Sequence, residues 1–173
     1  FFFLMIRFAI AGVGLLAFVL VNGRILPTRS QALNAMFAGA LIHGMYLAGV
    51  FWAIRNGMPA GMSALIVGLQ PIMTTLLANA VLRERTTPQL WAGLGIGLIG
   101  VALVLWPKLS VGGAGITPVT VAVSFFAVLA ISLGTVWQKR VDTGSDLVAG
   151  TAMQYTGATL FTGILTFAFE TQK

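Results

Sequence analysis

The stretch Gly57–Pro107 reads GMPAGMSALIVGLQPIMTTLLANAVLRERTTPQLWAGLGIGLIGVALVLWP. It consists of two apolar runs joined by a short charged turn, and each run is long enough to cross a bilayer. The pair Gln70-Pro71 interrupts the first run near its middle. Polar groups at mid-depth in lipid are costly and often mark a transport path. The stretch therefore predicts a membrane protein whose helices enclose a path for a solute.

The composition of the whole chain supports a lipid environment. Of its 173 residues, 58% are hydrophobic and 8% are charged, whereas a soluble domain carries about a quarter charged residues. The net charge is +6, but the basic residues lie singly or in pairs between apolar runs and form no patch for nucleic acid. Lipid is the expected surrounding partner, and no nucleic-acid partner is expected.

Six apolar runs follow one another, separated by short polar connections with Gly or Pro. Each has about the 20 residues that a membrane-spanning helix needs, and helices satisfy their own backbone hydrogen bonds in lipid. The predicted fold is an all-α polytopic bundle of about six spans: Phe1–Val21, Asn34–Ile54, Gly61–Leu82, Gln89–Trp106, Ile116–Val136 and Leu147–Phe169.

Basic residues in the connections predict the orientation of the bundle. One side holds Arg24, Arg29, Arg83, Arg85, Lys139 and Arg140, and the other holds Arg55, Lys108 and Lys173. Cytoplasmic loops carry the excess of Lys and Arg, so the first side is expected to be cytoplasmic. The chain then begins outside, and because it opens inside an apolar run with no initiator Met, we expect it to be a fragment of a longer protein.

His43 and Tyr46 are the polar residues near the middle of the second span. On a helix they share a face with Gly39 and Ala40, which would allow another helix to approach closely. His43 is therefore expected to point inward, either as an interhelical hydrogen-bonding group or as part of a substrate path. A metal site is not expected, because the chain has no second His and no Cys.

The third span carries its own polar stripe. Ser63, Gln70 and Thr74 fall on one helical face, and Pro71 removes a backbone hydrogen bond and frees a carbonyl group. A freed carbonyl is tolerated where protein or cavity water satisfies it. The stripe indicates either a packing kink with polar contacts or the lining of a cavity.

Two further polar residues lie in opposite ends of the chain and resemble each other in context. Ile6-Arg7-Phe8 can be laid over Met153-Gln154-Tyr155, and small residues follow both segments. Arg7 either snorkels to the outer interface or forms an inward cation for a carboxylate-bearing substrate. In the second case Gln154 and Tyr155 are its polar counterparts in a second repeat that begins near Ile116.

Gly93, Gly97 and Gly100 line one face of the fourth span. Small residues at this spacing let helices approach closely, so the face is predicted to pack against another helix of the same chain or against a second copy in a homodimer. Signals for an enzyme are poor: no carboxylate lies deep in a span, and no nucleophile turn, zinc-protease motif or phosphate loop occurs. No cofactor is expected.

Taken in order, these motifs resemble the EamA-type domain of the drug/metabolite transporter superfamily. The similarity runs through Arg7-Phe8 and then through the block ALIVGLQPIMTTLLANAVLRERTTPQLWAGLGIGLIGVALV at residues 64–104, with its central Pro71, Glu84 after the helix and Gly100-Val101. Residues 134–140 and 154–158 resemble the opening of the family's second repeat.

The resemblance implies ten helices in two inverted five-helix repeats with both termini cytoplasmic. Residues 1–107 would then hold helices two to five of the first repeat, 108–115 the linker, and 116–173 the first two helices of the second repeat. Family activities include export of amino acids and other metabolites, exchange, and drug efflux. The sequence therefore predicts an inner-membrane carrier, an exporter of a small polar metabolite such as an amino acid or another carboxylate. The alternative is a non-transporting membrane scaffold or accessory subunit.

Overall fold

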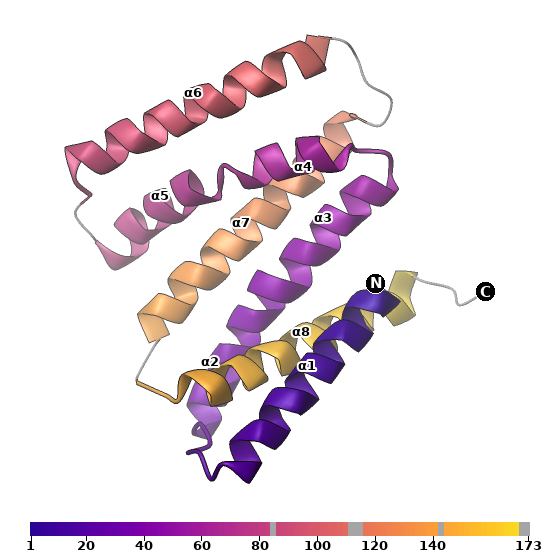
Figure 1. The fold of residues 1–173 in the computed structure, drawn as a ribbon, viewed down its shortest axis with the longest axis vertical. Coiled ribbons are helices and arrows are strands. Elements are labelled where there is room, and N and C mark those ends of the chain that lie inside the picture. Colours follow the sequence, from indigo (N-terminus) through magenta and orange to yellow (C-terminus); the bar gives the residue numbers. More distant parts are fainter. Residues whose placement is uncertain (84–85, 111–115, 142–143, 170–173) are drawn as a thin grey trace. The chain divides into compact units, whose positions relative to one another are not determined.

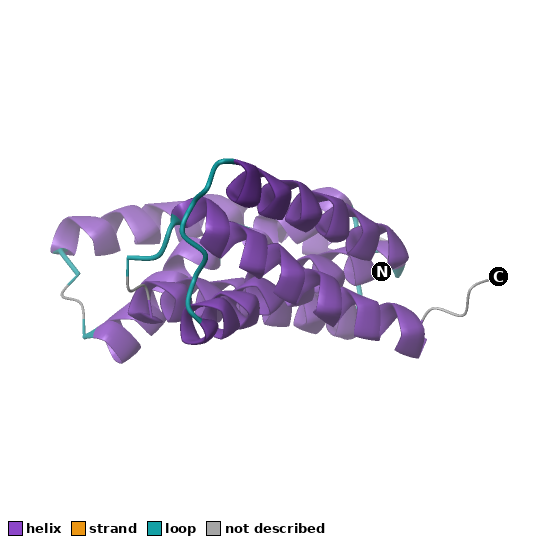
Figure 2. Cartoon of the chain, turned by 90° about the horizontal axis from the view of Figure 1, so that it is seen from below, coloured by secondary structure: helices purple, strands orange, loops and turns teal. Residues whose placement is uncertain are grey.

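The computed structural model describes residues 1–83, 86–110, 116–141 and 144–169. Figure 1 shows the order of their helices, and no strand occurs among the residues that Figure 2 colours. The elements are α1 (Phe2–Val21), α2 (Arg29–Gly39), the π-helical segment η1 (Ala40–Met45), α3 (Tyr46–Arg55), α4 (Ala60–Val67), α5 (Gln70–Leu82), α6 (Pro88–Ser110), α7 (Pro118–Val141) and α8 (Leu147–Phe169). The predicted all-α polytopic bundle is confirmed.

Four helical stretches in the described part of the chain are long and apolar enough to cross a membrane: Phe2–Val21, Arg29–Arg55, Ala60–Leu82 and Pro118–Val141. They correspond to four of the six predicted spans. The other two predicted spans coincide with α6 and α8, each of 23 residues. Helix α8 carries several threonines and Gln154 along its length.

Side-chain caps fix where several helices begin. The Thr28 hydroxyl accepts a hydrogen bond from the Gln31 backbone N–H, and the Thr28 N–H donates to Gln31 Oε1 at 2.9 Å, which completes a capping box for α2. The Thr87 hydroxyl accepts from the Leu90 N–H at the start of α6, where Pro88 is the first helical residue. These caps satisfy N–H groups that have no partner within the helix.

The helices form two compact units. The first consists of Phe1–Ala48 with Trp137–Lys173, and the second of Gly49–Val136. The predicted repeat boundaries concern topology rather than packing, so they stay a prediction. Helix α6 continues to Ser110, and residues 111–115 of the predicted linker lie outside the described part.

In the first unit, α8 packs against α1, α2 and η1. Leu4, Phe8 and Ala158 form its buried apolar cluster. At the crossing of α2 and α8 the backbones meet at two glycines: a Cβ atom on Gly39 would overlap the backbone of Gln154, and one on Gly157 would overlap the backbone of Met36. The close approach expected beside His43 is therefore present, because only glycine leaves room for it.

The second unit has its own apolar core, made of Ala53, Met58, Met62, Ile66 and Val128. Two polar contacts join α7 to α5 and to the connection between α3 and α4. The Thr74 hydroxyl on α5 donates to the Ser132 hydroxyl on α7 at 3.1 Å, and the Ser124 hydroxyl lies 3.3 Å from the sulfur of Met58.

The third predicted span is not one continuous helix. Helix α4 ends at Val67, Gly68 and Leu69 form a turn, and α5 begins at Gln70 with Pro71 in its first turn. Proline is tolerated in a first turn because the missing N–H would have no helical partner there. The predicted kink is thus a break, and it lies just before the proline.

The glycine face of α6 has no intramolecular partner in the described residues. Added Cβ atoms on Gly93, Gly97 and Gly100 would meet nothing within 4 Å, and all three residues are exposed. The predicted packing of this face remains a prediction, and the partner that the described residues do not supply would have to come from elsewhere.

The predicted orientation can be measured, because the chain contains no cysteine. We expect Ile25→Cys and Ser145→Cys, in the loops beside Arg24 and Lys139, to resist impermeant thiol reagents in intact cells and to react fully after lysis. Asn56→Cys, in the opposite loop, serves as the control and should react in intact cells. If both loop variants react with the reagent in intact cells, the predicted orientation is wrong.

Candidate functional site

The centre of the candidate site is a cluster of three rings in the first unit. His43 stacks on Tyr155 with centroids 4.9 Å apart and an interplanar angle of 16°. Phe8 lies 6.1 Å from the His43 ring and 5.9 Å from the Tyr155 ring. Three segments that are far apart in sequence, in α1, η1 and α8, therefore converge on one histidine.

The backbone around His43 departs from the α-helical pattern. Residues 40–45 form the π-helical segment η1, which lies between α2 and α3 within one span. Short π-helical turns inside α-helices are often found at functional sites, because they widen the helix and change the direction of neighbouring side chains. The segment therefore singles out His43 among the polar residues of the spans.

Two charged or polar residues reach the same histidine. The Gln154 side chain is hydrogen-bonded to His43, and Arg7 lies near enough to interact with it electrostatically. Gln154 is buried, whereas Arg7 is exposed in the described part of the chain. The structure thus brings together three of the predicted site residues.

The two segments that resemble each other in sequence, around Arg7 and around Gln154, both lie at His43 in the structure. Arg7 and Gln154 are equivalent positions in the predicted alignment of the two segments, and so are Phe8 and Tyr155. Each equivalent pair contacts or interacts with His43. Phe8 was not among the predicted binding residues, and Tyr155 was expected only as a polar counterpart of Arg7. The similarity of their two segments was the signal that could have assigned both to the site.

The other predicted residues lie apart from this cluster or in the second unit. Tyr46 is half-buried at the start of α3 and joins none of the ring contacts. The break before Gln70 divides the predicted stripe, placing Ser63 on α4 and Thr74 on α5. The Ser63 hydroxyl is buried without a hydrogen bond to a described residue, and Gln70 is half-buried.

A polar cavity of about 70 Å³ lies in the first unit beside α2, the end of α7 and the start of α8. Side-chain amides, hydroxyls and one carboxylate supply its polar surface. The residues around it are Gln31, Asn34, Ala35, Ala38, Gln138, Val141, Ser145, Asp146, Leu147, Gly150, Thr151 and Gln154. Gln154 therefore lies both at this cavity and beside His43. No group of three potential metal-ligating side chains gathers among the described residues.

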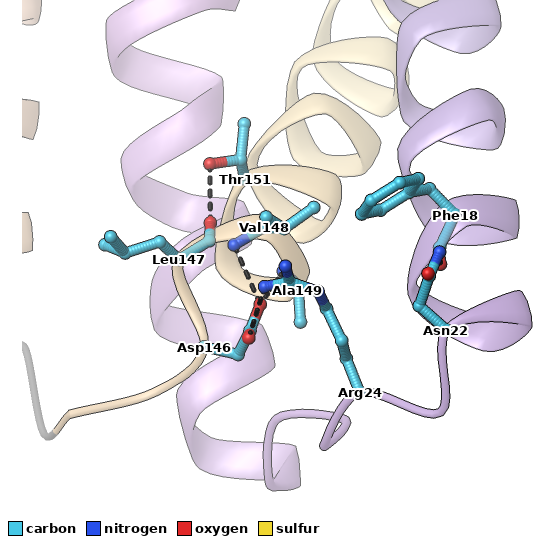
Figure 3. Close-up of polar contacts among 8 residues, drawn as sticks. All are labelled: Phe18, Asn22, Arg24, Asp146, Leu147, Val148, Ala149 and Thr151. Carbon is cyan, nitrogen blue, oxygen red and sulfur yellow. Dashed lines mark hydrogen bonds and ion pairs between the residues drawn. The ribbon is translucent and has the colours of Figure 1, made fainter.

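Asp146 is the charged residue of the cavity wall, and its partners hold it ionised. Its Oδ1 accepts hydrogen bonds from the backbone N–H groups of Ala149 at 3.0 Å and Val148 at 2.9 Å (Figure 3). Its Oδ2 lies 2.9 Å from Nη1 of Arg24. The Ala149 N–H, together with Arg24 and the Val148 N–H, lowers the pKa of the Asp146 carboxyl group.

Comparison with known proteins identifies relatives of the chain. Residues 1–106 match the model of the EamA-like transporter family. The chain is 28% identical over 145 residues to the uncharacterized inner membrane transporter YedA of Escherichia coli K12, a match that covers 84% of this chain and 46% of that protein. No solved structure matches the chain.

Two further relatives carry other names. Protein PecM of Dickeya dadantii strain 3937 is 26% identical over 145 residues, covering 84% of the chain and 46% of that protein. A probable amino-acid metabolite efflux pump of Salmonella typhimurium LT2 is 29% identical over 92 residues, covering 53% of the chain and 30% of that protein.

The chain spans about half the length of the curated relatives that it matches over 145 residues. The family match covers more than half of the chain, and the apolar helices agree with the membrane location named for a relative. This chain is a multi-pass inner-membrane protein, and it belongs to the EamA-like transporter family of the drug/metabolite transporter superfamily.

Proposed function

We propose that the protein is a carrier that exports a small polar metabolite, such as an amino acid or another carboxylate, across the inner membrane. The observation that carries the proposal is the contact of His43, which lies inside an apolar span, with Gln154 of α8, together with the electrostatic influence of Arg7. Polar and ionisable side chains at membrane depth are expensive and usually serve a solute path. The names of two relatives, a transporter and a probable amino-acid metabolite efflux pump, support the same activity.

In this proposal the polar residues around His43 line a hydrated path that opens to alternate sides of the membrane. His43 and Gln154 bind the polar part of the solute, and the stacked ring of Tyr155 holds the imidazole in place. Arg7 attracts a carboxylate toward the outer part of the path. Tyr46, Ser63, Gln70 and Thr74 stay proposed as further substrate-binding residues.

A second candidate is a scaffold or accessory subunit that does not transport. The exposed glycine face of α6 favours it, because a face of Gly93, Gly97 and Gly100 without a described neighbour suits assembly with another helix. Such a subunit would need no polar cluster at His43, so the carrier is the better-supported proposal.

Reconstitution of the complete protein in lipid vesicles tests the proposal. We expect labelled amino acids on one side to exchange with unlabelled ones loaded on the other, at a rate at least about tenfold above that of empty vesicles. A tenfold rate difference corresponds to about 1.4 kcal/mol. If none of the amino acids or related carboxylates moves above the rate of empty vesicles, the carrier assignment is wrong and the scaffold becomes the better assignment.

A further inference from the structure

The polar cavity beside α2 and α8 has features that the proposed solute path does not account for. It lies where the α1–α2 loop and the α7–α8 loop meet, held together by the ion pair of Arg24 and Asp146 across 122 positions of sequence. Its wall combines apolar side chains with amides, hydroxyls and one carboxylate, which is its charged group. Such a wall offers hydrogen-bond acceptors and one negative charge.

The two carboxylate oxygens of Asp146 have different tasks. Oδ1 caps α8 by accepting from two backbone N–H groups, whereas Oδ2 faces the guanidinium of Arg24 (Figure 3). The cap is local and belongs to the helix, but the contact with Arg24 joins two loops. Arg24 is 40% exposed and Asp146 23% exposed at the side chain, so water and small solutes can compete for the Oδ2 contact.

Arg24 also contacts a residue of the helix that precedes it, α1. Its guanidinium carbon lies 5.6 Å from the centroid of the Phe18 ring near the end of α1, within the range of a cation–π interaction. Arg24 can therefore leave Asp146 and remain against Phe18. The ion pair is thus an exchangeable contact.

The size and charge of the cavity limit what it can hold. A volume of about 70 Å³ exceeds what one water molecule needs but is far below the few hundred Å³ of a site that encloses a whole metabolite. It fits the polar end of a solute. A primary ammonium group has three donors and no acceptor, which matches amide oxygens, hydroxyls and a carboxylate.

We propose that this cavity is a binding subsite for the primary ammonium group of the transported solute, and that the ammonium group displaces Arg24 from Asp146 when it binds. The subsite rests on the proposed carrier function, and it adds the chemical class of the solute: a metabolite with an amino group. Binding of the ammonium group releases the contact between the two loops, so occupancy and loop separation are coupled.

If an ammonium group displaces Arg24, variants of Arg24 and Asp146 should change ammonium binding in opposite directions. An ion pair that only stabilises the fold would not have this effect. Asp146→Asn removes the charge but keeps an oxygen that can cap α8, since Asn is as good a cap as Asp. It should weaken binding of ethylammonium at least about tenfold, the size of a lost charge-assisted contact. Arg24→Gln removes the competitor and should strengthen binding of ethylammonium about threefold or more.

The measurement is titration of the complete protein in lipid nanodiscs with ethylammonium by calorimetry, with ethanol as the neutral probe of similar size. Ethanol binding should not differ between wild type and the two variants. Thermal unfolding checks that each variant folds, and Asp146→Ser, which also caps a helix without charge, repeats the test if Asp146→Asn does not. If both Arg24→Gln and Asp146→Asn weaken ethylammonium binding, or if neither changes it, the subsite is wrong.

Transport by the same variants separates this inference from the proposed function. In vesicles the wild-type protein should carry alanine faster than lactate, which has a hydroxyl in place of the amino group. If ethylammonium binds as expected but no solute moves, the carrier function fails and the subsite stands. If alanine moves but Asp146→Asn transports it at the wild-type rate, the subsite fails and the carrier function stands.

Discussion

Gly39→Ala is expected to destabilise the protein by about 3 kcal/mol, at the upper end of what overpacking costs. The added methyl group would overlap the backbone of Gln154, and backbone atoms cannot rotate away as a flexible side chain can. Helices α2 and α8 must therefore separate along their crossing. The measurement is reversible unfolding of the purified protein by denaturing detergent, read as the loss of helical signal.

Gly14→Ala is the matched control for this crossing. It lies in α1, where an added Cβ atom would meet nothing within 4 Å. Alanine is favoured over glycine inside a helix by up to about 1 kcal/mol, so this variant should be as stable as wild type or more stable. Equal stability of the Gly39 and Gly14 variants would show that the crossing tolerates an extra side chain and that the close approach is unimportant.

Gln154→Leu is expected to lower solute exchange in vesicles at least tenfold while the protein still inserts and folds. Leucine has a similar size but cannot bond to His43, so it leaves the imidazole without the partner that orients it. It also removes a polar group from the wall of the cavity. Both losses act on the solute path more than on the bundle, because the apolar contacts of α8 are kept.

Thr159→Val provides the comparison for Gln154→Leu. Thr159 lies about one turn further along α8, and its hydroxyl donates to the backbone carbonyl of Tyr155 in its own helix at 2.8 Å. Loss of such a local bond changes little, so exchange should stay near the wild-type rate. Wild-type exchange by Gln154→Leu would make Gln154 a structural residue and remove it from the proposed path.

Much of the fold follows from local sequence signals. Apolar runs of about 20 residues predicted the helical spans, because hydropathy depends on neighbouring residues alone. Gly39 predicted the close approach beside His43 for a similar reason: a missing side chain on an inward face is visible in the sequence.

The candidate site was less predictable, because it depends on pairs distant in sequence. His43, Arg7 and Gln154 were expected to be functional, but nothing local to His43 says that Phe8 and Tyr155 lie beside its ring. The ion pair of Arg24 and Asp146 joins two loops, and helical periodicity cannot predict a contact between loops. The break at Gly68 and Leu69 was not predicted, because the sequence analysis attributed the kink to Pro71. A proline in fact fits the first turn of a new helix.

The π-helical segment at Ala40–Met45 has a consequence for how this span tolerates insertions and deletions. A π-helical turn accommodates one residue more than an α-helical turn. Removing one residue from it would restore a regular helix and leave the residues after Met45 facing nearly the same way, because the turn already absorbs the extra residue. Removing one residue from the regular helix α3 would instead rotate everything that follows by about 100°. Single-residue deletions within η1 should therefore preserve helix content and the directions of Tyr46 and its neighbours, whereas a deletion within α3 should preserve helix content but turn the rest of that helix to a different side.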